Sequence, residues 1–197
     1  MNPNAISYLH DQLDRPREER PDSGQPAGPD GQLVELRQLD DYVIAEGDPD
    51  IRGWEVKTAA GLGDRTVGYV EDLIVDRDTL RVRYVLVCLD KDAVATTRDR
   101  RILVPVGVGR LDEHNDQVRL DGYTTGQLVG IPEFRPGKLT RQYEATVRRR
   151  FAPPAPKAGP RSRRSVDFYD QDEFDERSLW GLRRRGRDDL PYLTRHD

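Results

Sequence analysis

The sequence of 197 residues has little of what builds a large core or a covalent framework. Hydrophobic and charged residues each make up 35%, whereas globular domains average about 45–50% and about 25%. A single cysteine, Cys88, excludes an internal disulfide and a cysteine-based zinc site, and it suits a reducing compartment. The longest run in the middle without a charge, glycine or proline is Tyr84–Leu89, far below the ~20 apolar residues that a membrane span needs. We expect a modest domain that does not cross a bilayer.

The sequence also lacks a signal peptide and an excess of positive charge. The N-terminus has neither the basic start nor the apolar centre of a signal peptide. The net charge is −4, from 32 basic and 36 acidic residues. A chain of this charge has no general attraction to nucleic acid or anionic lipid, although a local patch could still bind either.

Prolines divide the chain into three parts. Of the 14 prolines, all but Pro105, Pro132 and Pro136 lie at or before Pro49 or at or after Pro153. Polar, proline-rich segments cannot bury enough surface to offset their ordering entropy. The distribution predicts an N-terminal tail over 1–32, a folded domain over 33–151 and an extended tail over 152–197.

The middle of the chain reads as a series of short strands. Segments such as WEVKT, TVGYVEDLIVD, RVRYVLVCL and RRILVPVGVGRL are rich in β-branched and aromatic residues and are bounded by Gly, Asp or Asn. Their spacing of roughly ten residues is typical of a small all-β domain. Both faces of the strand after Arg83 are apolar, which predicts a strand in the centre of a closed barrel or sandwich.

A helix is expected to close the domain. Leu139, Tyr143 and Val147 recur every four residues, and Phe151 follows in register. Three arginines, residues 148–150, suit the negative end of the helix dipole. We expect this apolar stripe to pack on the domain itself.

The sequence contains no complete catalytic or metal-binding pattern. All serines lie in the tails, the three histidines have no helical partner for a metal, and Cys88 lies within an apolar strand where a thiol is inert packing. The glycines at 107 and 109 open no phosphate-binding pattern, and the acidic run from Asp170 lacks the glycine and glutamate of a calcium loop. We therefore expect a protein that is not an enzyme and holds no cofactor or metal.

The tails carry the candidate partner-binding residues. Ile6, Leu9 and Leu13 follow helical spacing and form either a docking helix or a frayed end. The second tail is either an interaction tail or disordered, and its aromatic residues favour interaction because rings gain free energy by burial. Its candidates are Phe168, Tyr169, Trp180 and Tyr192, together with Arg183, Arg184 and Arg185. Nucleic acid is the weaker partner, because each basic triplet is balanced by nearby acids.

One stretch carries a recognisable pattern. RGWEVKTAAGLGDRTVGYVEDLIVD contains a glycine before the first strand, then a hairpin and the motif G-x-V-x-D-L-I-V-D. It resembles the opening of the PRC-barrel family, and the resemblance extends over about 33–151. The structural positions of the motif are Gly53, Gly68, Asp72 and Asp76. Gly68 would allow a close strand approach, and the two aspartates would cap the turn into the next strand.

The resemblance implies a small antiparallel β-barrel used for binding, with a short C-terminal helix and long extended tails. The GIPEF and LT segments are similar to the cytoplasmic domain of the photosynthetic reaction centre H subunit. This implies a non-catalytic scaffold that is peripheral on the cytoplasmic face of the inner or photosynthetic membrane. Its partners would be the reaction-centre core subunits and a separate membrane anchor chain, with contacts to anionic lipid headgroups. The alternatives are a free cytoplasmic stress or regulatory protein and, more weakly, an RNA-binding or ribosome-maturation role.

Overall fold

The structure is a computed structural model, and it describes residues 33–59, 63–152, 168–180 and 192–195. Ile6, Leu9, Leu13 and Arg183–Arg185 lie outside this range. The strands are β1 Leu33–Glu35, β2 Tyr42–Ile44, β3 Glu55–Thr58, β4 Arg65–Asp76, β5 Arg81–Leu89, β6 Arg100–Pro105, β7 Arg110–Asp112, β8 Gln117–Leu120 and β9 Leu193–Arg195. The helices are α1 Thr125–Val129, α2 Arg141–Phe151 and α3 Glu176–Trp180, with 3-10 turns η1 Leu36–Gln38, η2 Val106–Val108 and η3 Asp172–Phe174.

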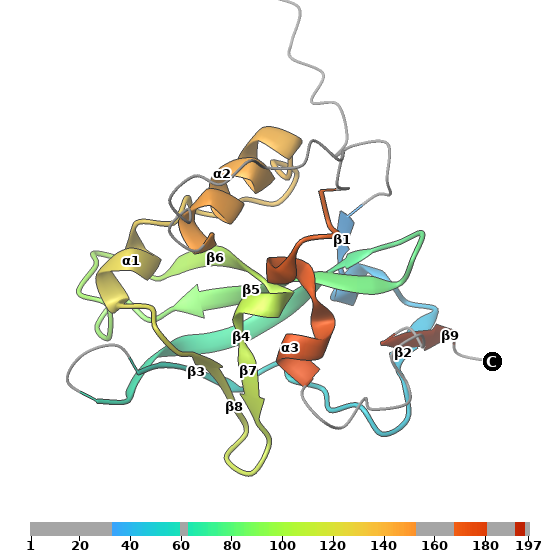
Figure 1. Cartoon of the computed structure of the whole chain (residues 1–197), viewed down its shortest axis with the longest axis horizontal. Helices are drawn as coiled ribbons and strands as arrows, with labels where there is room; N and C mark the ends of the chain where they lie inside the picture. The colour runs from blue at the N-terminus through green and yellow to red at the C-terminus, as the bar shows by residue number, and fades with distance from the viewer. Residues whose placement is uncertain (1–32, 60–62, 153–167, 181–191, 196–197) are drawn as a thin grey trace, which may run out of the picture.

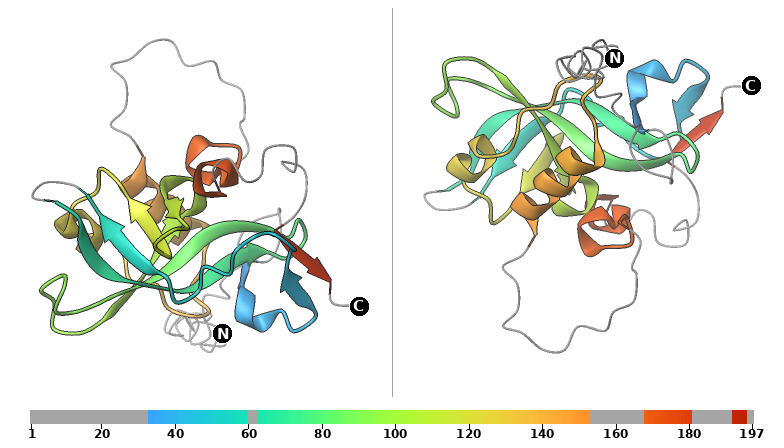
Figure 2. Two further views of the ribbon diagram at one scale, coloured as in Figure 1. Left: turned by 90° about the horizontal axis from the view of Figure 1, so that it is seen from below. Right: turned by 90° about the horizontal axis from the view of Figure 1, so that it is seen from above.

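Seven of the strands form one sheet in the order β6-β5-β4-β3-β8-β7, and β1 pairs with the second half of β4 (Figure 1). The remaining two, β2 and β9, form a separate antiparallel pair. Figure 2 shows α2 and α3 on one side of the large sheet and the β1–η1–β2 segment on the other. The fold is therefore a mostly β domain with a few short helices.

The expectation of a closed, purely antiparallel barrel is wrong in two respects. The first and last strands of the order, β6 and β7, are not paired, and β3 pairs with β8 in parallel. The free edge of β6 is occupied by the loop after α1, because the Phe134 N–H donates to the Arg101 carbonyl at 2.7 Å. The Arg100 guanidinium donates to the Ile131 carbonyl of the same loop at 3.1 Å. The first contact takes a backbone carbonyl of β6 that a closing strand would need, and the second holds the loop beside it.

The expectation for the central strand is confirmed. β5 lies between β4 and β6, and every residue from Tyr84 to Leu89 is buried. Strands covered on both sides read as continuous apolar runs rather than as alternating ones, which explains the sequence pattern. These residues form the middle of the hydrophobic core.

The closing helix is also confirmed. α2 begins after Thr140, whose hydroxyl accepts a hydrogen bond from the Tyr143 N–H at 3.2 Å, and it buries Val147 and Phe151 against the domain. Such an N-cap satisfies one of the donors that the first helical turn leaves without a partner.

Part of the second tail is folded and not extended. Residues 168–180, here called the C-terminal segment, contain η3 and α3. Phe174, Leu179 and Trp180 belong to the same core as β5. The sequence suggested an extended tail because the region is polar and begins with a proline-rich stretch. The aromatic side chains of the segment gain more free energy by packing on the domain than by staying in water.

Candidate protein-binding site

A β-bulge in β4 determines which way the polar side chains on one face of the sheet point. In the register with β5, Val70 lies opposite Val87 and Asp72 lies opposite Leu86, so that Glu71 has no opposing residue. A bulge bends the strand and changes where the following side chains point. Here it places the Glu71 side chain toward the outside while Asp72 is 1% exposed.

Asp72 does not cap the turn after β4, contrary to the sequence expectation. Its Oδ1 accepts from the Leu73 N–H at 2.9 Å and its Oδ2 from the Arg37 N–H at 3.3 Å, so it holds the bulge against η1. Burial is the largest influence on this carboxyl and raises its pKa, against the opposing effect of these hydrogen bonds. Asp76 does cap the turn, because its Oδ1 accepts from the Asp78 N–H at 3.1 Å.

Glycine is needed at positions 68 and 53 for two different structural reasons, as Gly68 and Gly53 show. A Cβ on Gly68 would lie 2.9 Å from the Cys88 carbonyl carbon and from the Leu89 Cα, and closer still to the Cys88 oxygen. The expected close approach of two strands is therefore confirmed. Gly53 has open space around it but a φ of +86°, and its N–H donates to the Val70 carbonyl at 2.8 Å in the turn before β3.

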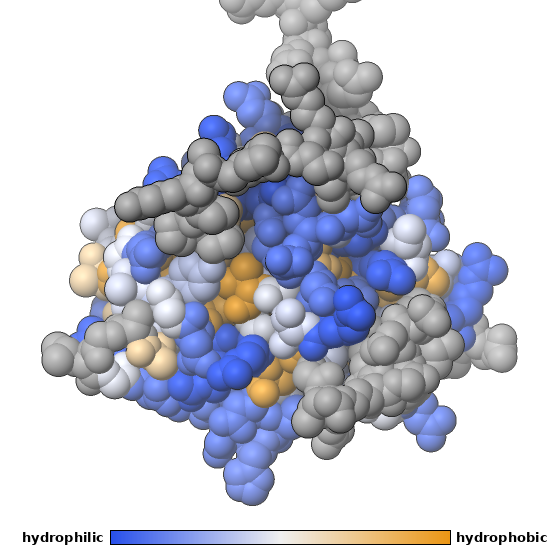
Figure 3. All heavy atoms as spheres, viewed as in Figure 1, coloured by the Kyte–Doolittle hydropathy of each residue, from blue (hydrophilic) through white to orange (hydrophobic). Residues whose placement is uncertain are grey.

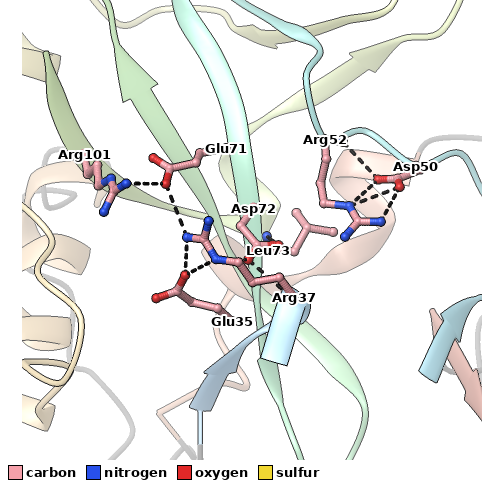
Figure 4. Close-up of polar contacts among 8 residues, drawn as sticks. All are labelled: Glu35, Arg37, Asp50, Arg52, Glu71, Asp72, Leu73 and Arg101. Carbon is pink, nitrogen blue, oxygen red and sulfur yellow. Dashed lines mark hydrogen bonds and ion pairs between the residues drawn. The ribbon is translucent and has the colours of Figure 1, made fainter. Parts of the chain in front are cut away.

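Figure 4 shows the charged cluster beside the bulge, in which Arg37 lies among three carboxylates. The Arg37 Nε donates to Glu35 at 2.7 Å and lies 3.3 Å from Asp72, and its Nη2 donates to Glu71 at 3.3 Å. Arg101 from β6 approaches the same Glu71 oxygen at 2.7 Å. Both guanidinium groups remain nearly half exposed, at 47% and 44%, whereas the carboxylates are mostly covered. The cluster therefore presents arginine to solvent.

Tyr69 adds an exposed aromatic side chain to the same face. The register places Tyr69 between Cys88 and Glu55, and Cys88 lies opposite Arg101. The ring is 48% exposed, and only Val43 is comparable among the large hydrophobic residues that the structure describes. We name Arg37, Tyr69, Glu71 and Arg101 the outer sheet patch. Aromatic residues and arginine are enriched where proteins bind one another.

A surface hollow of about 580 Å³ adjoins this patch at Arg37. The exposed Val43 and the ion pair of Arg52 with Asp50 lie on its wall. The other lining residues are Leu36, Leu39, Tyr42 and Ile44. Apolar walls with a charged rim resemble the layout of a protein interface more than that of a catalytic cleft.

The aromatic candidates of the second tail point into the molecule. Tyr169, Trp180 and Tyr192 are 8%, 3% and 0% exposed, and Phe168 is half-buried. Trp180 and Tyr192 stack with ring centroids 4.4 Å apart, and the Tyr192 hydroxyl donates to the Pro49 carbonyl at 2.8 Å. In this conformation the four rings pack against the domain. A partner could contact the three buried rings directly only if the C-terminal segment and Tyr192 left the domain.

A buried carboxylate holds the C-terminal segment, and the sequence analysis did not find it. Glu144 of α2 is 0% exposed, and its Oε2 accepts from the hydroxyls of Tyr84 at 2.9 Å and Tyr169 at 2.6 Å. The Arg141 guanidinium lies 4.0 Å from the other oxygen. The available signal was a glutamate three residues before the buried Val147, on the flank of the apolar stripe.

Burial raises the pKa of Glu144, although the two tyrosine hydroxyls, Arg141 and Arg83 act in the opposite direction. The folded protein therefore binds this proton more tightly than the unfolded chain. We expect the contribution of Glu144 to stability to improve as the pH falls from neutral toward the ordinary glutamate value of about 4.3.

The measurement is urea unfolding at pH 7 and pH 5 for the natural chain and for Glu144→Gln. The natural chain should gain stability on acidification relative to the variant, because the amide has no proton to take up. A relative loss at pH 5 would contradict the raised pKa. The comparison of two chains cancels the titration of the other carboxylates, including Glu133, whose pKa is lowered by its hydrogen bond from Arg98.

The described residues offer little chemistry. Among them, no group of three or more His, Cys, Asp or Glu side chains is arranged to hold a metal ion. Burial raises the pKa of the Cys88 thiol, which keeps it protonated at neutral pH and a poor nucleophile. None of the helices in the described ranges has the length and apolar character that crossing a bilayer requires.

Comparison with known proteins gives a family for the middle of the chain. Residues 44–126 match the PRC-barrel domain family. A segment of 77 residues is 35% identical to an uncharacterized protein of Deinococcus radiodurans and covers 39% of this chain. The chain spans about a quarter of the length of that relative, 26%.

Proposed function

We propose that the chain, whose residues 44–126 match the PRC-barrel domain family, is a non-catalytic subunit that binds another protein through its outer sheet patch. The carrying observation is Tyr69, an aromatic ring 48% exposed on a rigid strand and bordered by the arginines of the charged cluster. Rings held on strands lose little side-chain entropy on binding, and tyrosine and arginine dominate interface energetics.

The charged cluster suits binding because its ion pairs already hold the arginines in place. Arg37 is held by Glu35 and Asp72, and Arg101 by Glu71. A partner that offers carboxylates or backbone carbonyls meets guanidinium groups that have little freedom left to lose. The hollow beside Arg37 could take an apolar side chain of the same partner.

A narrower form of the proposal names a membrane-embedded complex as the partner. In that form the chain is peripheral on the cytoplasmic face, with the scaffold role of a reaction-centre H subunit, and contacts core subunits and a separate anchor chain. It rests on the sequence resemblance alone. A free cytoplasmic protein with a soluble partner is the alternative.

The test uses the immobilised full chain, its Tyr69→Glu variant and the matched control Arg150→Glu, which puts the same residue at an exposed position of α2, on the other side of the sheet from η1 (Figure 2). Each is exposed to detergent-solubilised membranes and to the soluble fraction of the source cell. We expect one protein that the natural chain and the control retain and that Tyr69→Glu binds at least about tenfold less, as for an interface hot spot.

Retention from the membrane fraction would support the scaffold form, and retention from the soluble fraction would support the free protein. An unchanged set of proteins on Tyr69→Glu would place the binding surface elsewhere and overturn the proposal.

A further inference from the structure

The C-terminal segment is attached to the domain as a separate piece. In sequence it is separated from α2 by residues 153–167, a connection that can reach about 50 Å when extended. In space it lies against β5, η2 and α2 (Figures 1 and 2). The face that carries these elements is mainly hydrophilic, with small separate apolar areas in its middle (Figure 3).

Three arginines of the domain surround the two rings at the start of the segment. The Arg83 guanidinium lies 4.3 Å from the centre of the Tyr169 ring, and the Arg141 guanidinium lies 4.8 Å from Phe168 and 4.9 Å from Tyr169. Arg148 lies 5.4 Å from Phe168. A cation over a ring face is attracted by its quadrupole, more strongly when water is excluded. The domain therefore recognises an aromatic pair with cations from two elements.

Carboxylate and amide groups of the segment meet the same arginines. Arg148 pairs with Glu173 and donates to the Gln171 side-chain oxygen. The Tyr169 hydroxyl donates to the buried Glu144, so the site also has an acceptor placed for a phenol. Aromatic recognition and charge recognition are thus combined within seven residues of the segment.

Phe174 adds an apolar contact to the aromatic and charged contacts of the segment. Phe174 is 3% exposed and contacts Tyr84 of β5 edge-to-face, with ring centroids 5.3 Å apart. The segment is less well covered on its other flank, where a hollow of about 600 Å³ lies between it and the β4–β5 turn at Thr79 and Arg81. The segment is therefore covered by the domain on the side of β5 and open to water on the side of this turn.

We propose that the groove formed by α2, β5 and η2 is a docking site for protein segments in which two adjacent aromatic residues precede carboxylates, and that residues 168–174 occupy it as an intramolecular ligand. The inference does not rest on the outer sheet patch, which lies on η1, β4 and β6. The partner is a protein segment of this chemistry, bound when it displaces the chain's own.

The intramolecular ligand sets a threshold for any competitor. A connection of this length gives a tethered segment an effective concentration of the order of millimolar. A free peptide therefore binds the natural chain weakly, and its affinity rises once the tethered segment is displaced.

Gly107 of η2 provides a way to block the groove without touching the arginines. A Cβ at this position would lie 2.8 Å from the Glu173 carbonyl carbon and 2.9 Å from the Asp175 nitrogen, and closer still to the Asp172 oxygen. These are backbone atoms of the segment, and a free peptide in the same position would meet the same Cβ. The control is Gly126→Ala, since a Cβ there meets nothing within 4 Å.

The experiment measures fluorescence anisotropy of a labelled peptide with the sequence of residues 166–177 on full-length proteins. We expect the Glu173→Lys chain, in which the charge that Arg148 binds is reversed and every groove residue is unchanged, to bind at least tenfold more tightly than the natural chain. Adding Gly107→Ala or Arg148→Glu to Glu173→Lys should abolish this binding. Adding Gly126→Ala, or Arg150→Glu at an exposed position of the same helix as Arg148, should not. A peptide with alanine for both adjacent aromatics should not bind.

A second variant covers the case in which Glu173→Lys fails to fold. Phe168→Ala removes the ring that Arg141 and Arg148 contact, and it leaves every groove residue unchanged. It should also tighten binding of the natural peptide. Equal affinity of both variants and the natural chain, or equal binding of the peptide without aromatics, would overturn the inference. Loss of partner binding through Tyr69→Glu bears on the proposed function alone.

Discussion

Replacing Gly68 by alanine is expected to lower the free energy of unfolding by more than about 3 kcal/mol, at or beyond the upper range for overpacking. The new Cβ would meet the Cys88 carbonyl and the Leu89 Cα, which are backbone atoms and cannot rotate aside as a side chain can. β4 and β5 would have to separate in the middle of the core. Because small domains have about 5–15 kcal/mol in total, the loss should be visible in urea unfolding.

The matched control for this change is Gly126→Ala in α1. The position is exposed and has open space, so the added methyl group should be neutral or stabilise the helix by up to about 1 kcal/mol. A Gly68→Ala protein within 1 kcal/mol of the natural chain would show that the two strands do not approach as closely as the structure has them.

Replacing Glu144 by leucine is expected to cost about 2–5 kcal/mol. The change leaves the buried hydroxyls of Tyr84 and Tyr169 without their acceptor, and each lost partner costs about 1–3 kcal/mol. It also removes the negative charge that faces Arg141 and Arg83 while both arginines stay. Urea unfolding measures the loss, and limited proteolysis should show earlier cleavage within the C-terminal segment.

Glu144→Gln is the control because an amide oxygen in the same place can accept both hydroxyls. It should retain most of the stability at pH 7. A leucine variant as stable as the glutamine variant would mean that the tyrosine hydroxyls find other partners, and would remove Glu144 from its role in holding the segment.

The parts of the fold that were predictable from sequence are those with a local pattern. The continuous apolar run of β5 and the four-residue stripe of α2 each identify an element and the side it buries. Gly68 was predictable because a glycine inside a strand pattern indicates a close backbone approach.

The pairing of distant strands was not predictable in this way. Nothing within the short β3 and β8 indicates that they pair in parallel, because the pairing depends on how the chain between them returns. The position of Asp72 was misjudged for a related reason: the bulge that buries it exists only in the register of β4 with β5. Local turn chemistry suggested a cap, and the tertiary contact with Arg37 determined the outcome.

In the candidate sites, too, local sequence patterns were predictable and tertiary contacts were not. An exposed Tyr69 and a buried Tyr169 have equivalent sequence surroundings, since each is an aromatic residue near acidic ones. The partners that distinguish them, Arg101 and Glu144, come from other elements of the fold. The aromatic content of the second tail therefore predicted that its rings would be buried, but not that the domain itself would bury them.

The pairing of β2 with β9 has a consequence for synthesis on the ribosome. Tyr42 lies opposite Arg195 and Ile44 opposite Leu193, so a strand made early must wait for one made about 150 residues later. At about 5–20 residues per second this wait is roughly 8 to 30 s. During that time the N–H and C=O groups of β2 lack their final partner, and a chaperone that shields exposed strand edges would have most effect on the yield of folded protein in this interval.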